Sequence, residues 1–292
     1  MHDQADELRQ LVLRTAASAR LPAAPPPPIV VVSGGKGGVG ATTVAVNLSI
    51  VLARLGRRIV LVDADLNQPD ATALCNLKEA DTVADVLSGR RTVHEVLQSG
   101  PGGIQMLPGA WAPQRLTDCP PLAQQRMLTE LSRLGAHADV VILDAGNKVD
   151  SVTERFWQAA DLVLLVTTSE AAAIMDSYAA VKLLAPRGSQ PAHVCSLVNK
   201  AASSAAAEDV HARIRQAAQR FLSLEIHATA HVPEDNEVVL AERKHQPFVL
   251  HRPECPAARA LEQVAEQVCL QLASSIKNGN SGTTRTSRTG VA

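Results

Sequence analysis

Residues 35–43 constrain the fold more than any other part of this chain. They read Gly-Lys-Gly-Gly-Val-Gly-Ala-Thr-Thr, follow an apolar run at residues 29–32, and precede residues 44–52, whose apolar spacing suits a helix packed on a sheet. Glycines accept backbone angles that other residues avoid, so consecutive N–H groups can converge on phosphate oxygens at the positive end of the following helix. The segment therefore predicts a strand, a phosphate-binding loop and a helix, in that order.

One position of this loop departs from the common pattern G-x-x-x-x-G-K-[ST], in which the lysine reaches the β- and γ-phosphates and the hydroxyl residue binds Mg²⁺. Gly35, Gly40 and Thr42 fit the pattern, but Ala41 occupies the lysine position. Lys36 leaves the opposite end of the loop and cannot simply replace that lysine. The sequence therefore predicts that a nucleotide binds and that its hydrolysis is slow.

Apolar runs of strand length alternate with helical patterns along most of the chain. The predicted strands are residues 29–32, 59–62, 104–107, 140–143, 162–166, 194–198 and 226–231. This alternation is typical of βαβ units and predicts an α/β fold, a mainly parallel sheet with helices on both faces. Ligands of such sheets bind at the carboxyl ends of the strands.

Length and composition favour one folded domain with appendages. A chain of 292 residues, 46% of them hydrophobic, can bury the core of a single α/β domain, which we place at residues 29–276. Residues 3–20 show an amphipathic helical pattern, and the proline-rich residues 21–28 predict an extended spacer between that helix and the core. The polar residues 277–292 predict a disordered tail.

Charge and cysteine usage restrict the function classes. A formal net charge of -1 lacks the overall basic character of most nucleic-acid-binding domains, so we expect no direct nucleic-acid contact. The five cysteines are odd in number and form no C-x-x-C pair, which argues against a metal site or a secreted disulfide framework. No signal-peptide pattern or membrane span is evident, so we expect a cytoplasmic protein.

Two groups of carboxylates follow predicted strands. Asp63 and Asp65 come directly after the second strand, with Asp70 shortly beyond, and Asp144 follows the fourth. Carboxylates at the strand ends beside a phosphate loop can organise Mg²⁺ and orient an attacking water. The alternatives are a solvated acidic turn for the first group and a turn-capping role for Asp144.

The order Lys36-Gly37-Gly38-Val39-Gly40 resembles the deviant P-loop of the MinD/ParA group of ATPases. In that family the early lysine crosses the interface of a nucleotide-sandwich dimer and touches the partner's phosphates. Most members also keep the lysine that Ala41 replaces here. The resemblance implies a three-layer P-loop NTPase fold, ATP and Mg²⁺ as ligands, a homodimer on ATP binding, and catalytic roles for Lys36 and for Asp65, which would position the water.

The same resemblance assigns residues to the nucleotide and the metal. Asn199 stands where the family hydrogen-bonds adenine, and Pro233 matches a proline of that pocket. The residues implied in nucleotide binding are Gly35, Lys36, Gly37, Gly38, Val39, Gly40, Ala41, Thr42, Thr43, Asn199 and Pro233. Those implied in holding Mg²⁺ are Thr42, Asp144 through water, and Asp63. The chain departs from the family pattern at Asn147 and Lys148, and Lys148 is a candidate for the charge missing at position 41.

The amino terminus carries a second motif. Residues 3–9 fit the pattern D-Q-A-x-x-L-R of the FlhG family (FleN or YlxH), MinD-like regulators of flagellar number and placement. In that family the segment docks on the GTPase FlhF and stimulates GTP hydrolysis. The residues implied in this partner activation are Asp3, Gln4, Ala5, Leu8 and Arg9. A flexible spacer suits a segment that must reach into another protein. Further partners among flagellar switch or regulatory proteins are left open.

The carboxyl-terminal helix bears on localisation. Residues 261–276 show an apolar stripe, but the opposite face is rich in Glu and Gln instead of Lys and Arg, so a core-packing helix is favoured over a membrane anchor. We therefore expect location at the cell pole or membrane only through partners.

Three other functions remain as alternatives. The first is a localisation scaffold for pilus or secretion assembly that resembles CpaE and TadZ, binds ATP and hydrolyses little. The absence of a receiver-like domain and the motif at residues 3–9 count against it. A DNA-partitioning ParA ATPase is disfavoured by the balanced charge. A biotin- or cobalamin-pathway ligase is the most remote.

Overall fold

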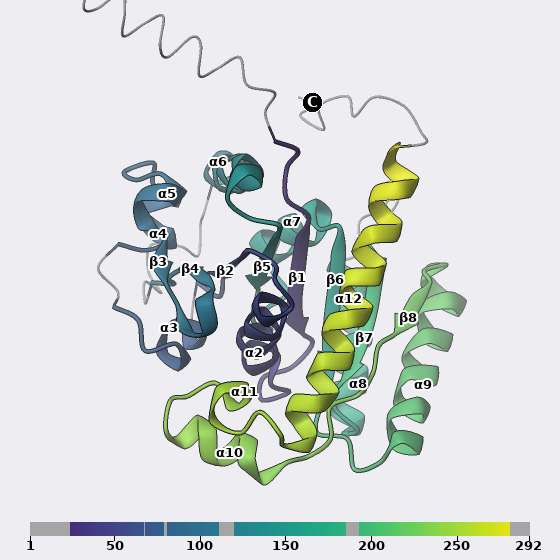
Figure 1. The fold of residues 1–292 in the computed structure, drawn as a ribbon. Helices are drawn as coiled ribbons and strands as arrows, with labels where there is room; N and C mark the ends of the chain where they lie inside the picture. Colours follow the sequence, from purple (N-terminus) through teal and green to yellow (C-terminus); the bar gives the residue numbers. More distant parts are fainter. Residues whose placement is uncertain (1–23, 67, 79–80, 111–119, 185–192, 281–292) are drawn as a thin grey trace, which may run out of the picture.

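The computed structural model describes residues 24–66, 68–78, 81–110, 120–184 and 193–280. These residues form an eight-stranded sheet with helices on both faces (Figure 1). The strand order is β3-β4-β2-β5-β1-β6-β7-β8, and all neighbouring strands are parallel except β3 and β4. The predicted α/β class, with a mainly parallel sheet between two helical layers, is confirmed.

The strands are buried on both sides, which explains why the sequence shows continuous apolar runs instead of alternation. In chain order they are β1 (Ile29–Gly34), β2 (Ile59–Asp63), β3 (Gln98–Ser99), β4 (Gln105–Leu107), β5 (Val140–Asp144), β6 (Leu162–Thr167), β7 (His193–Val198) and β8 (Ile226–Ala228). Every residue of β1 is buried. Alternate side chains point to opposite faces, so Val30 and Val31 belong to two separate cores.

Each core is closed by its own set of helices. One face packs against α2 (Ala41–Arg54), α3 (Asp70–Leu74), α10 (Asn236–Arg243), α11 (Phe248–His251) and α12 (Pro256–Asn280). The other packs against α4 (Val83–Leu87), α5 (Val93–Val96), α6 (Pro121–Ser132), α7 (Ser151–Ala159), α8 (Ala171–Leu184) and α9 (Ser204–Leu222). Two short 3₁₀ turns, η1 (Pro101–Gly103) and η2 (Arg133–Ala136), complete the described elements.

The helices α2 and α12 cross the same face of the sheet (Figure 1). Leu261, Val264 and Val268 of α12 are almost completely buried there. Burying a Leu or Val side chain contributes about 1.5–3 kcal/mol, so this stripe holds α12 on the sheet. The prediction of a core-packing helix is confirmed for residues 261–272.

Beyond shifts of one or two residues at strand ends, the structure differs from the sequence expectations at four places. Strand β3 was not predicted, because two residues give no periodic signal, and β8 ends at Ala228, three residues earlier than expected. Helix α12 reaches Asn280, four residues into the predicted tail. The spacer also enters the core: Pro27 is buried, and the carbonyl of Pro28 accepts a hydrogen bond of 3.0 Å from the amide of Val141. Proline has no backbone N–H group, but its carbonyl can still accept a hydrogen bond, so the end of the spacer continues the pairing of β1 with β5.

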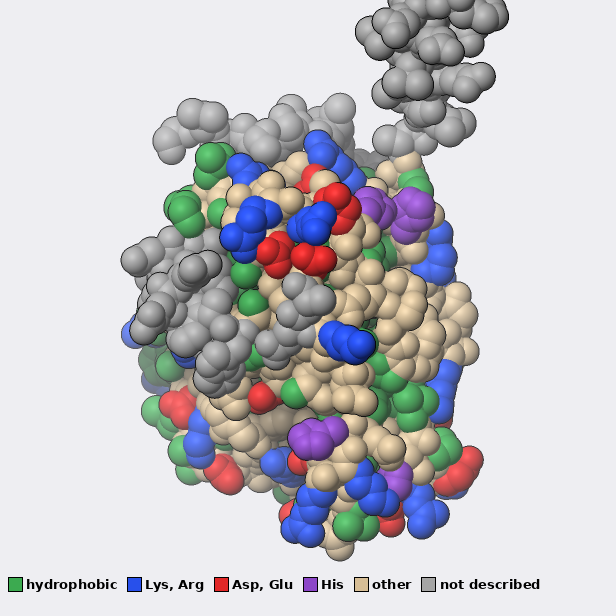
Figure 2. Space-filling view, turned by 90° about the vertical axis from the view of Figure 1, so that its left-hand side faces the viewer, with side chains coloured by type: hydrophobic (Ala, Val, Ile, Leu, Met, Phe, Trp, Pro, Cys, Tyr) green, Lys and Arg blue, Asp and Glu red, His purple; other side chains and the backbone are tan. Residues whose placement is uncertain are grey.

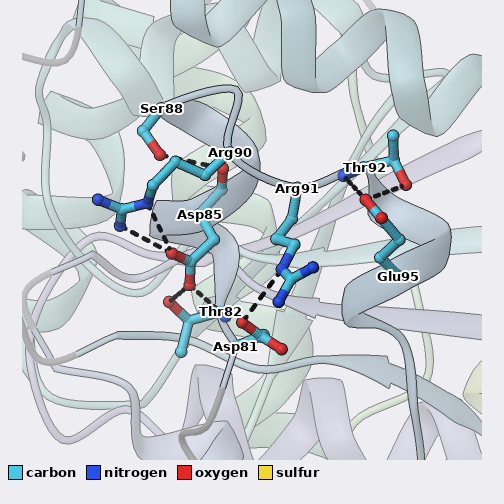
Figure 3. A network of polar contacts seen from close by, with 8 residues as sticks. All are labelled: Asp81, Thr82, Asp85, Ser88, Arg90, Arg91, Thr92 and Glu95. Carbon is cyan, nitrogen blue, oxygen red and sulfur yellow. Dashed lines mark hydrogen bonds and ion pairs between the residues drawn. The ribbon is translucent and has the colours of Figure 1, made fainter.

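Polar contacts cap the starts of α4 and α5 (Figure 3). The amide of Thr82 donates to Asp85 Oδ2 at 2.9 Å and Arg90 donates to Asp85 Oδ1 at 2.7 Å, which caps α4. Thr92 and Glu95 form the equivalent capping box of α5.

Figure 2 shows this side of the molecule, where positive and negative side chains are intermixed. The described part of that face therefore offers no continuous basic surface for nucleic acid.

Candidate functional site

The glycine loop lies where the sequence placed it, between the end of β1 and the start of α2 (Figure 1). Gly38 and Gly40 take positive φ angles of 82° and 87°, a region that favours glycine. A Cβ atom on Gly40 would lie 2.5 Å from Nδ2 of Asn199, so no larger residue fits there. The loop therefore depends on glycine both for its backbone angles and for its close contact with Asn199, the residue after β7.

Residues that follow β7 hold this loop from one side. Asn199 Nδ2 donates to the carbonyl of Val39 at 2.8 Å, and Lys200 Nζ donates to the carbonyl of Gly38 at 2.9 Å. Asn199 is buried and Lys200 is exposed. The amide nitrogen of Asn199 is thus engaged by the loop itself.

Asp63 and Asp144 end the neighbouring strands β2 and β5 and are register partners. Both are completely buried. Asp63 Oδ2 accepts from the amide and the hydroxyl of Thr72 at 2.8 and 2.6 Å, and Asp144 Oδ1 accepts from the amide of Gly146 at 3.3 Å, with the hydroxyl of Thr42 near enough to lower the pKa of Asp144. Asp63 Oδ1 and Asp144 Oδ2 have no hydrogen-bond partner among the described residues.

This arrangement has an electrostatic cost that a cation would offset. Burial raises the pKa of Asp144 to about 7, and burial together with the nearby Asp144 carboxylate raises the pKa of Asp63 well above its usual range. A buried carboxylate without a partner is unfavourable unless it is neutralised. The two unpaired oxygens, with the hydroxyl of Thr42 beside them, therefore fit Mg²⁺.

No group of three or more His, Cys, Asp or Glu within the described ranges has metal-binding geometry. That is compatible with Mg²⁺, which keeps several waters and usually takes only one or two carboxylates plus substrate phosphates.

Asp65 follows β2 and faces Gly146, the second residue after β5. A side chain on Gly146 would overlap the carboxylate of Asp65, and Gly146 has a positive φ of 62°. Asp65 Oδ1 accepts from the amide of Gln68 at 3.2 Å. On the other side, Asn147 Nδ2 would lie 3.3 Å from a Cβ on Gly37. The structure thus brings Asp65, Gly146 and Asn147 to the edge of the glycine loop.

The ammonium of Lys36 is paired with a residue outside the loop. Its Nζ lies 2.9 Å from Oε2 of Glu170, the residue before α8, and both side chains are partly exposed. The ion pair and hydrogen bond with Glu170 raise the pKa of Lys36. No local sequence pattern marks Glu170 as a partner of Lys36, because the two residues are 134 positions apart.

Two further positions border the loop and the start of α2. Thr43 Oγ1 donates to Glu242 Oε1 of α10 at 2.8 Å, a contact that sequence reasoning missed because no local motif marks Glu242. Pro233 pairs with Ala201 in an isolated parallel bridge, next to Asn199 and Lys200. The predicted pocket residues Asn199 and Pro233 therefore lie at the same end of the sheet.

The implied partner-activating residues at positions 3, 4, 5, 8 and 9 lie outside the described residues.

The fold and this site define a P-loop nucleotide-binding protein. Residues 28–181 match the family model described as an AAA domain. The chain is 34% identical over 233 residues to the antiactivator FleN of Pseudomonas aeruginosa, covering 80% of this chain and 83% of that protein. The chain therefore belongs to the FlhG (FleN/YlxH) branch of the MinD/ParA family of P-loop ATPases.

Two more comparisons agree with this assignment. The flagellum site-determining protein YlxH of Helicobacter pylori is 25% identical over 148 residues, which covers 51% of this chain and 50% of that protein. The septum site-determining protein MinD of Pyrococcus horikoshii OT3, complexed with Mg-ADP, has the same fold with a TM-score of 0.69 and 22% identity, covering 85% of this chain and 98% of that one. Within the described ranges, no helix has the length and apolar character needed to cross a membrane.

Proposed function

We propose that this chain is an ATP-dependent dimerising switch that regulates flagellar number and placement. The observation that supports ATP and Mg²⁺ most directly is the pair of buried carboxylate oxygens, Asp63 Oδ1 and Asp144 Oδ2, left without partners beside the glycine loop. The flagellar role is supported by the similarity to FleN and to the flagellum site-determining protein YlxH.

In this proposal the main-chain N–H groups of the loop bind the phosphates at the positive end of α2. Thr42, Asp144 through water, and Asp63 would hold Mg²⁺. Bound Mg²⁺ neutralises charge on the phosphate oxygens. Asp65 accepts a hydrogen bond from the attacking water and orients it. Asn199 and Pro233 contact the adenine.

Hydrolysis is slow in this proposal because Ala41 supplies no charge. Loss of one charged donor aimed at a transferring group costs about 10²-fold or more in rate. Binding survives better, because the N–H groups of the loop remain. In the dimer Lys36 leaves Glu170 and reaches the phosphates of the second protomer.

The amino-terminal segment is the output of the switch in this proposal. Its motif, with Gln4 at the centre, docks on FlhF and stimulates GTP hydrolysis. The spacer at residues 21–28 gives it reach, since residues 24–26 are exposed, although the backbone at Pro25 already lies close to Gly135.

The first test is calorimetry and light scattering of the full chain with Mg-ATP. Binding heat and a doubling of mass are expected. If the full chain shows neither binding heat nor a gain in mass, the proposal is wrong.

The second test mixes a peptide of residues 1–20 with FlhF and measures GTP turnover. Stimulation by the native peptide, lost on Gln4→Ala, is expected. Absence of stimulation would remove the flagellar part and leave the alternative favoured by Ala41, a localisation scaffold that binds ATP and hydrolyses little.

A further inference from the structure

The loop of this chain lacks the lysine that most of its family carries, so the question is which cation replaces it. Ala41 stands at that position and is buried. Lys36, the cation within the loop, is paired with Glu170. Lys200 is the other cation whose ammonium contacts the loop among the described residues, and it donates to the loop's own backbone, at Gly38.

The backbone at Lys200 is in an unfavourable conformation that the fold imposes. Its φ is 53°, in the left-handed region that non-glycine residues rarely occupy. The hydrogen bonds on both sides hold it there: the amide of Asn199 donates to Thr167 at 2.8 Å, and the amide of Ala201 donates to Val232 at 3.0 Å. Strain of this kind tends to persist at functional sites. Here it accompanies a side chain that reaches the glycine loop.

The contact orients the peptide groups of the loop. A trans peptide group is planar, so its C=O and the next residue's N–H point in opposite directions. With the carbonyl of Gly38 held by Lys200 and that of Val39 held by Asn199, the N–H groups of Val39 and Gly40 face away from these side chains. These two N–H groups have no hydrogen-bond partner among the described residues. They are left to donate to an anion.

The charge of Lys200 adds to this effect. Its ammonium polarises the peptide group between Gly38 and Val39 and makes the N–H of Val39 a stronger donor, as a charge-assisted hydrogen bond does. Among the described residues no carboxylate lies within ion-pair distance of Lys200, although Glu170, which is itself paired with Lys36, lies near enough for the charge of Lys200 to help lower its pKa. The attraction between this positive charge and a bound ligand grows with the negative charge of the ligand.

We propose that Lys200 is a positioning residue that compensates for Ala41: it fixes the loop with its N–H groups toward the phosphates and supplies positive charge from behind the loop. This inference rests on the proposed nucleotide binding. Lys200 acts through Gly38 and Val39 and does not touch the reacting phosphate. It therefore favours nucleotides with more phosphate groups over nucleotides with fewer.

The test compares Lys200→Met, which keeps the length of the side chain and removes the charge, with Lys200→Arg, which keeps the charge. Calorimetry of the full chain gives Kd for Mg-ATP and for AMP. Lys200→Met should weaken Mg-ATP binding about tenfold, with a much smaller effect on AMP. Lys200→Arg should keep most of the Mg-ATP affinity of the unaltered chain. Lys182→Met, at an exposed position in the last turn of α8, is the matched control and should bind both nucleotides like the unaltered chain.

A second variant tests compensation directly. With Ala41→Lys present, Lys200→Met should lose much less Mg-ATP affinity, because the lysine at position 41 supplies the charge. The melting temperature of each variant shows that it is folded, and Met has the same β-carbon strain at this position as Lys.

Three outcomes would overturn the inference. They are an unchanged Mg-ATP affinity in Lys200→Met, an equal loss for ATP and AMP, and a loss produced by Lys148→Met instead, which would assign the missing charge to Lys148. If the unaltered chain binds no Mg-ATP, the proposed function itself fails and the inference falls with it. The two failures are therefore distinguishable.

Discussion

The ammonium of Lys36 lies 2.9 Å from the carboxylate of Glu170 in its own chain. By resemblance this lysine should touch the phosphates of a partner, so the contact with Glu170 must break before it can do so. Both side chains are partly exposed, and exposed ion pairs are weak, which makes the contact easy to exchange. The monomer thus holds Lys36 in a position that competes with the proposed dimer.

Glu170→Gln should therefore promote dimerisation. Removing the carboxylate charge leaves Lys36 without its partner, so less of the monomer is held in the competing conformation. The ATP concentration at half-dimerisation, measured by analytical ultracentrifugation, should fall by less than about tenfold. Glu254→Gln, which breaks the exposed pair with Arg259, is the control and should leave it unchanged. If the two variants dimerise at the same ATP concentration, Glu170 does not compete with the dimer for Lys36.

Ala41→Lys should raise the rate of ATP hydrolysis. The new ammonium would face the transferring phosphate, and one such donor is worth about 10²-fold in kcat. Ala41→Met is the matched control, because it crowds the same buried position without a charge. Phosphate release under saturating Mg-ATP is the measurement. Equal rates in the lysine and methionine variants would show that the missing lysine does not limit turnover.

Asp144→Asn should stabilise the nucleotide-free protein while it abolishes Mg²⁺-dependent hydrolysis. The carboxylate is completely buried and one of its oxygens has no partner, so replacing it with a neutral amide removes a desolvation cost of about 1–3 kcal/mol. Thermal unfolding at pH 8 without nucleotide and phosphate release with Mg-ATP are the two measurements. A lower melting temperature would mean that Asp144 serves the fold and not the metal.

Asp85→Ala should destabilise the protein at neutral pH but not at low pH. Partial burial alone would raise the pKa of Asp85, but hydrogen bonds from Thr82 and Arg90 outweigh it and lower the pKa (Figure 3). Because the folded-state pKa lies below the usual value, the stabilisation is present above about pH 4 and is lost as the pH falls through the lowered pKa.

The expected loss for Asp85→Ala is about 1 kcal/mol in the free energy of unfolding at pH 7, typical of a lost helix cap. Urea unfolding at pH 7 and at pH 3 measures the difference, which should shrink at the lower pH. Asp209→Ala, which removes an exposed i,i+4 pair with Arg213, should change little at either pH. A loss that is equal at both pH values would assign the effect of Asp85 to packing instead of charge.

The sequence by itself determined the parts of this protein that depend on consecutive residues. Glycine chemistry placed the loop, apolar runs placed seven of the strands, and the residues that end them placed Asp63 and Asp144 at one edge of the sheet. Boundaries such as the end of β8 at Ala228 were less accurate, because pairing with β7 decides where a short strand stops.

Only the tertiary structure decided which side chains surround the loop. Glu170 meets Lys36 across 134 positions, Lys200 meets Gly38 across 162, and Glu242 meets Thr43 across 199. These contacts exist because the sheet order puts β6 next to β1 and β7 next to β6, and because α10 returns to the start of α2. A single sequence carries the periodicity that forms each element, but the neighbours of a loop are fixed by how distant elements pack, which no local pattern encodes.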